Sequence, residues 1–167
     1  MRYLIFVFVS ACDLTLPPAM LPSAMEGTSD SSFTTSSSSS NSSQPLSSSL
    51  NQYGSWLTPS SDGDLWIQVD LGHPQFIVML RLAPPSNDTS QYVTEATAEC
   101  SLNGEEFISF ADFETGAKQI FEGSNESTTH RTRLHLCRFV RLLPKKWNGS
   151  PAFRWDLIRC PSNSNKS

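Results

Sequence analysis

The sequence predicts an all-β protein, a sandwich or jelly roll of antiparallel strands, and three observations lead to that prediction. From Trp56 onward, short apolar or alternating runs are separated by turn-forming residues, which is typical of a β-sandwich. The pair Asn103-Gly104 stands between two such runs and is a strong β-hairpin signal. No segment combines a 3.6-residue apolar period with helix caps. No internal repeat divides the chain, so we expect a single domain.

The first strands are predicted from alternation and from the turns that bound them. In strand 65–71, Ile67 and Val69 point to one face, and the Gly-His-Pro turn that follows ends the strand. Strand 76–82 is an apolar run that ends before the Pro-Pro pair of a turn-rich loop. Strand 92–101 alternates again, with Tyr92 and Cys100 on one face.

The later strands are shorter or less regular. Asn103-Gly104 leads the chain into strand 107–110, and a brief strand at 118–121 is followed by a polar loop at 123–129. A longer strand at 134–143 is closed by Pro144, because proline cannot donate to a strand ladder. The last predicted strand is 153–160.

Composition excludes some classes of function. The 167 residues contain 12 Lys and Arg against 16 Asp and Glu, a formal net charge of −4. A nucleic-acid binder normally carries a basic patch, so we expect no nucleic-acid partner. Apolar residues reach 38% of the chain, enough for a hydrophobic core, and no apolar run approaches the length of a membrane span.

The N-terminal segment suggests the compartment. Residues 1–11 contain a basic start, a seven-residue apolar run and small residues before Cys12, the order found in a secretory signal peptide. An N-terminal core strand is the alternative interpretation. We therefore expect an extracellular or secreted protein, with a short polar tail at 161–167.

The four cysteines fit an oxidising compartment. They are widely spaced, without the close ligand pairs of a zinc site, so no metal site is expected. Four cysteines allow three pairings. Cys12 and Cys160 lie at the two ends of the expected mature chain, and the termini of a domain are often close together. Cys100 and Cys137 then form a second bridge or remain as buried thiols.

Sequons for N-glycosylation recur along the chain. Asn41, Asn87 and Asn125 are the expected acceptors. Asn148 is a poorer acceptor, because Pro151 follows its sequon directly, and a further sequon begins at Asn165.

Several motifs, in order, resemble the discoidin domain, also called the coagulation factor V/VIII type C domain. The most recognisable string is Trp66-Ile67-Gln68-Val69-Asp70-Leu71-Gly72. The other matching stretches are 25–37, Leu50-Asn51, Gly54-Ser55-Trp56, Tyr92-Val93-Thr94, 100–107, 121–126, 138–142 and 153–157, before the closing Cys160. The resemblance covers 12–160. It implies an eight-stranded, antiparallel jelly-roll β-sandwich of the galactose-binding-like type, with its terminal cysteines bridged. Cys100 and Cys137 both replace residues usual in the family, which favours their pairing.

Some residues are expected to be structural. Large aromatic and charged side chains in strand-like strings are the candidates, namely Trp56, Trp66, Asp70, Arg141, Trp147, Arg154, Trp155 and Asp156. We expect at least one of these arginines to pair with one of the aspartates across the sandwich, because buried charges need partners.

No catalytic constellation is visible. The serines include no Gly-x-Ser-x-Gly elbow, and there is no glycine-rich phosphate loop. We therefore expect a protein that is not an enzyme and needs no cofactor. A structural Ca²⁺, which some relatives hold, cannot be placed on particular residues.

Binding is expected in loops at one end of the sandwich, at 36–51, 84–91 and 123–131. The candidate ligand-binding residues are Leu46, Tyr53, Asn87, Asp88, Tyr92, Asn125, His130 and Arg131. The resemblance implies cell adhesion through a cell-surface or matrix glycan or a protein ligand. Peripheral binding to anionic, phosphatidylserine-containing membranes is the alternative, and a third is a fragment of a larger receptor or secreted enzyme. The first two loops offer few apolar tips and few basic residues, which disfavours the membrane.

Overall fold

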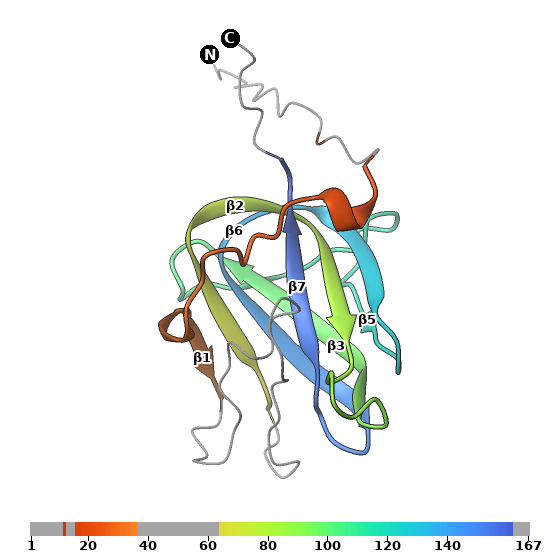
Figure 1. Ribbon diagram of the computed structural model, residues 1–167. Coiled ribbons are helices and arrows are strands. Elements are labelled where there is room, and N and C mark those ends of the chain that lie inside the picture. The colour runs from red at the N-terminus through yellow and green to blue at the C-terminus, as the bar shows by residue number, and fades with distance from the viewer. Residues whose placement is uncertain (1–11, 13–15, 37–63, 162–167) are drawn as a thin grey trace, which may run out of the picture.

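The computed structural model describes residue 12 and residues 16–36 and 64–161 (Figure 1). Two 3₁₀ turns, η1 (Pro18–Met20) and η2 (Asp30–Ser32), precede the strands. The strands are β1 (Phe33–Thr35), β2 (Ile67–Ala83), β3 (Tyr92–Ser101), β4 (Ile108–Ser109), β5 (Phe121–Glu122), β6 (Thr128–Asn148) and β7 (Arg154–Arg159). All the pairings between them are antiparallel, so the predicted all-β class is confirmed.

Two long strands build the sandwich. The first half of β2 pairs with β1, its second half pairs with β7, and β6 pairs with both halves. The second half of β6 also pairs with β3, which carries β4 and β5. Figure 1 shows how β2 and β6 bend over one end of the molecule, so that the sheet folds back on itself. The core lies between the two halves.

The prediction that β2 is two separate strands was wrong. The turn at 72–74 bends one continuous strand, because the ladder with β6 jumps from Asp70↔Phe139 to Gln75↔Cys137. Such an irregularity bends a strand without ending it. Gly72 supplies the left-handed backbone of this bend, with φ +80°.

Strand β6 is also longer than predicted at both ends. It begins at Thr128, because residues 128–131 pair with the end of β2. It continues through Pro144, which lies opposite Ala96 beside a register shift. A proline is tolerated at such a bulge because the ladder is already interrupted there.

The core is apolar and rich in aromatic side chains. The largest fully buried side chains are Trp155, Phe110, Phe121 and Phe153, and the half-buried Trp147 packs against the core. Ile67 and Val69 are completely buried, as their alternation predicted. Trp56 lies outside the described residues.

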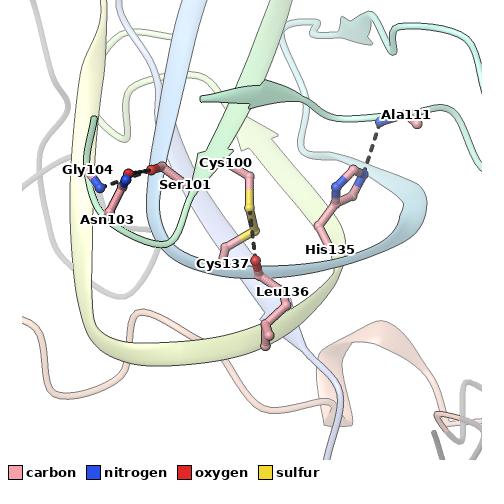
Figure 2. Close-up of a disulfide and its surroundings, with 8 residues drawn as sticks. All are labelled: Cys100, Ser101, Asn103, Gly104, Ala111, His135, Leu136 and Cys137. Atoms are coloured by element: carbon pink, nitrogen blue, oxygen red, sulfur yellow. Dashed lines mark hydrogen bonds between the residues drawn. A yellow bond between two sulfur atoms is a disulfide. The ribbon is translucent and has the colours of Figure 1, made fainter. Parts of the chain in front are cut away.

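Both disulfide pairings of the prediction are present in the structure. Cys12 and Cys160 are bridged with a Cα–Cα distance of 5.4 Å, and Cys100 and Cys137 with 5.5 Å. Figure 2 shows the inner bridge, where Sγ of Cys100 lies 3.4 Å from the carbonyl oxygen of Leu136. The inner bridge is part of the main core, whereas the terminal bridge packs on a smaller apolar cluster outside it.

The charged side chains pair differently from the prediction. Asp70 accepts hydrogen bonds from Arg138, with Nε to Oδ1 at 3.0 Å and Nη2 to Oδ2 at 3.1 Å, and not from Arg141 or Arg154. Asp156 is buried and accepts a hydrogen bond from the Ser23 hydroxyl at 2.5 Å. The pairs that meet are fixed by strand register, which a single string of residues does not reveal.

Arg141 and Arg154 are structural in other ways. The Arg141 guanidinium lies between two rings, 4.5 Å from the centroid of Trp66 and 4.0 Å from that of Phe107. Its Nη2 donates to Gln68 at 2.9 Å. Nε of Arg154 donates to the carbonyl of Pro84 at 2.9 Å, which joins β7 to the loop after β2.

Candidate functional site

Three turns leave the sandwich at the same end, and we call them together the loop end. They are the β2–β3 turn at 84–91, the β5–β6 turn at 123–127 and the β6–β7 turn at 149–153. Strand register brings their starting points together, because Leu82 pairs with Thr128, Ala83 with Arg154 and Tyr92 with Asn148. Figure 1 shows these turns at the lower end of the molecule, opposite the bend of β2.

The β2–β3 turn is shaped by Asp88. Its Oδ1 accepts hydrogen bonds from the Ser90 hydroxyl at 2.6 Å and from the Ser90 backbone N–H at 3.0 Å. Its Oδ2 accepts a hydrogen bond from the side-chain Nε2 of Gln91 at 2.6 Å. An Asx turn of this kind is a local solution that Asp favours. The hydrogen bonds from Ser90, followed by those from Gln91, lower the pKa of the Asp88 carboxyl, so it is ionised at neutral pH.

Hydrogen bonds tie this turn to the β6–β7 turn. Nδ2 of Asn148 donates to the carbonyl of Ser90 at 2.8 Å, and the Ser150 hydroxyl bonds to Oε1 of Gln91. Gly149 has φ +71°, the left-handed conformation that lets the chain reverse. These contacts fix two of the three turns relative to each other.

The β5–β6 turn depends on Gly123. A Cβ at this position would lie 2.1 Å from the carbonyl oxygen of Val93, so glycine is required for the two backbones to approach. The Gly123 amide donates to the carbonyl of Thr94 at 3.0 Å. Asn125 is exposed at the tip of the turn.

The structure gathers four of the predicted site residues at the loop end. Asn87 and Asp88 lie on the β2–β3 turn, Tyr92 begins β3 beside it, and Asn125 lies on the β5–β6 turn. Asn87 and Asn125 are exposed, while Asp88 and Tyr92 are half-buried. Leu46, Tyr53 and the sequon at Asn41 lie outside the described residues.

His130 and Arg131 were wrongly assigned to a loop. Both lie within β6, because its ladder with β2 already includes Leu80↔His130. His130 Nε2 lies 2.7 Å from the carbonyl oxygen of Glu122, and its ring lies edge-to-face with that of Phe121, with the two centroids 5.8 Å apart. Arg131 lies over the ring of Phe113, 5.8 Å from its centroid.

Sequence reasoning missed Gln91 and Ser150, and treated Asn148 only as a sequon. Asn148-Gly149 is an Asn-Gly pair like the one at 103–104, and it marks the β6–β7 turn. That signal predicts the turn, but the contact of Gln91 with Ser150 on the β6–β7 turn depends on the tertiary fold.

The described part of the loop end has a polar and acidic character. The large exposed apolar side chains of the described residues all lie elsewhere on the protein. The residues of the three turns include Asp88 and Glu126 and no Lys or Arg. Within residues 16–36 and 64–161, together with Cys12, no cluster of three or more His, Cys, Asp or Glu could hold a metal ion. The same residues contain no helix long and apolar enough to cross a membrane.

Comparison with solved structures agrees with the fold. Discoidin II from Dictyostelium discoideum superposes with a TM-score of 0.59 at 17% identity, over 81% of this chain and 56% of that one. A Clostridium perfringens module, solved in complex with GalNAc-β-1,3-galactose, gives a TM-score of 0.56 at 13% identity over 77% and 96% of the two chains. At these identities the likeness concerns the fold alone.

Sequence comparison gives the family. Coagulation factor V of Sus scrofa is 29% identical over 125 residues, which are 70% of this chain and 6% of that much longer protein. The chain therefore corresponds to one small part of this relative. A family model of the F5/8 type C domain matches residues 32–157, most of the chain. The chain belongs to the F5/8 type C, or discoidin, domain family.

Proposed function

We propose that this protein is an extracellular, non-catalytic recognition domain that mediates cell adhesion by binding a glycan or a protein ligand at its loop end. F5/8 type C domains are typically non-catalytic binding modules. Coagulation factor V, which is related to this chain, is an extracellular or secreted protein. Two disulfides fit the same compartment.

The observation that carries the proposal is the hydrogen-bonded polar surface shared by the β2–β3 and β6–β7 turns. Asp88, Gln91, Asn148 and Ser150 offer both donors and acceptors. Their mutual hydrogen bonds hold them in place before a ligand arrives, which lowers the entropic cost of binding. Sugar hydroxyls, or the backbone of a protein ligand, match such groups.

The membrane alternative has less support at this end. Insertion into an anionic bilayer uses apolar side chains at loop tips with basic residues around them. The three described turns present neither, and their carboxylates would be repelled by anionic lipid.

A glycan array with the secreted full-length chain tests the proposal. We expect binding to a defined saccharide class. The variant Gln91→Ala should lose at least about tenfold in affinity, because it removes the hydrogen bonds to Asp88 and Ser150. Glu105→Ala is the matched control, because Glu105 is exposed in the β3–β4 hairpin at the far end of β3. Adhesion to immobilised matrix proteins covers the protein ligand.

Vesicle sedimentation separates the two classes of partner. We expect no sedimentation of the chain with vesicles of phosphatidylcholine and phosphatidylserine beyond that with phosphatidylcholine alone. Binding to the anionic vesicles that persists at high salt would contradict the proposal.

A further inference from the structure

The loop end carries a concentration of sequons. Asn87 lies on the β2–β3 turn, Asn125 on the β5–β6 turn and Asn148 at the end of β6, and all three are exposed. The ladder pairs Leu82↔Thr128 and Tyr92↔Asn148 place these positions at one end of the sandwich. Three acceptor sequences from distant parts of the chain thus converge on the surface proposed to bind ligand.

The three asparagines differ in the hydrogen bonds that their sequons make. Asn148 donates its side-chain amide to Ser90, and the hydroxyl of its sequon residue Ser150 is bonded to Gln91. Within the described part of the chain, the side chains of Asn87 and Asn125 make no hydrogen bond. Their sequon hydroxyls, on Thr89 and Ser127, belong to exposed residues. Asn148 therefore supports the turn, whereas Asn87 and Asn125 have no such structural use.

We infer that Asn87 and Asn125 carry N-linked glycans, and that these glycans shield the loop end against broad surfaces while leaving it open to slender ligands. The inference rests on the proposed extracellular function. Transfer requires a lipid-linked oligosaccharide pyrophosphate as donor. The asparagine nitrogen bonds to C1 of the donor sugar, the C1–O bond to pyrophosphate breaks, and the nitrogen loses one proton as the lipid pyrophosphate leaves.

The shield follows from the position of the two acceptors. An N-linked glycan is bulky and hydrophilic. A bilayer must lie flat across the whole end to make contact, so two glycans standing on separate turns keep it away. A single sugar chain or peptide needs only the space between them, beside Asp88 and Gln91. Glycosylation thus adds a steric reason to the electrostatic one for the loop end to exclude an anionic bilayer.

Peptide mapping of the full chain secreted from eukaryotic cells tests the modification. We expect glycans on Asn87 and Asn125, detected as conversion of each asparagine to Asp by a peptide-N-glycosidase in ¹⁸O-labelled water. The variant Thr89→Ala/Ser127→Ala keeps both asparagines and should lose both glycans. Ser124→Ala is the matched control, because it changes a serine of the same turn and leaves both sequons intact. Absence of glycan on either asparagine overturns the inference and leaves the proposed function untouched.

Labelling rates test the shield without any ligand. Ser86→Cys places a thiol on the exposed β2–β3 turn, and Glu105→Cys places one in the distant β3–β4 hairpin. A small maleimide should label residue 86 equally in the glycosylated chain and in the chain with Thr89→Ala/Ser127→Ala. A large polyethylene-glycol maleimide should react roughly tenfold more slowly with the glycosylated chain, because the glycans are bulky. At residue 105 the labelling rate of each reagent should be the same in the glycosylated and the unglycosylated chain.

Equal rates of the large reagent at residue 86 in the two chains would overturn the shield. If Thr89→Ala/Ser127→Ala is poorly secreted, the glycosylated chain trimmed by endoglycosidase under native conditions supplies the same comparison.

Discussion

Gly123 occupies a position where the fold leaves no room for a side chain. Its missing Cβ would lie 2.1 Å from the carbonyl oxygen of Val93. We expect Gly123→Ala to lower the free energy of unfolding by about 3 kcal/mol, because one backbone must move away from the other. Urea denaturation measures the loss.

Gly72→Ala is the control for this prediction. Gly72 has φ +80° but nothing within 4 Å of an added Cβ, so only backbone strain of about 1 kcal/mol is expected. Equal losses in the two variants would mean that close approach to Val93 is not what demands glycine at position 123.

His135 gives stability a dependence on pH. Burial lowers the pKa of the imidazole below its ordinary value of 6.5. Nε2 accepts the Ala111 amide at 3.1 Å, as Figure 2 shows, so the folded state holds a neutral ring with its proton on Nδ1. Below about pH 6.5 the His135 ring binds a proton in the unfolded chain, whereas in the folded chain its lowered pKa keeps it neutral to a lower pH. The contribution of His135 to the free energy of unfolding therefore falls as the pH drops from 7 to 5.

Replacing the titrating ring tests that prediction. His135→Gln should lose part of the slope of unfolding free energy against pH between 5 and 7, measured by urea denaturation at several pH values. A slope identical to that of the unaltered protein would show that His135 is not its source.

At the scale of elements, Arg141 clamps the β3–β4 hairpin onto the sheet. Its guanidinium stacks between Trp66, next to β2, and Phe107, next to β4. Lysine keeps the charge and loses the planar stacking surface. We expect Arg141→Lys to cost about 1–2 kcal/mol of unfolding free energy, with faster hydrogen exchange at 102–107.

Arg138→Lys is the comparison for the clamp. The Arg138–Asp70 pair is partly exposed, with 41% and 32% of the two side chains accessible, so its loss should cost less unfolding free energy than the loss of the Arg141 contacts. The prediction fails if hydrogen exchange at 102–107 responds equally to both substitutions.

At the scale of the whole molecule, the two disulfides differ in access to solvent. Cys100 and Cys137 are 2% and 0% exposed, while Cys12 and Cys160 are half-buried at the edge of the small apolar cluster. A reductant reaches an exposed bridge more readily. We expect mild reduction of the native protein to open Cys12–Cys160 first, which differential alkylation and mass mapping would detect. Earlier alkylation of Cys100 or Cys137 would refute this order.

The pattern of the sequence predicted the class of fold and much of its local structure. The alternation of 65–71 gave the buried face of β2, and Asn103-Gly104 gave the hairpin between β3 and β4. Both signals are local, because alternation reports one buried face and Asn-Gly favours one turn geometry. The discoidin motifs added the family, and with it the bridge between Cys12 and Cys160.

Only the tertiary structure decided which distant groups meet. A Gly-His-Pro signal marks a bend, but whether the strand ends there depends on its partner strand, and here β6 continues the ladder beyond it. The partner of Asp70 lies 68 residues away and is set by register. Register also places His130 within β6, opposite Leu80. It brings Asn148 and Ser150 next to the β2–β3 turn, where Ser150 bonds to Gln91. Side-chain chemistry is written in the sequence, but the distances between side chains arise only when the strands pair.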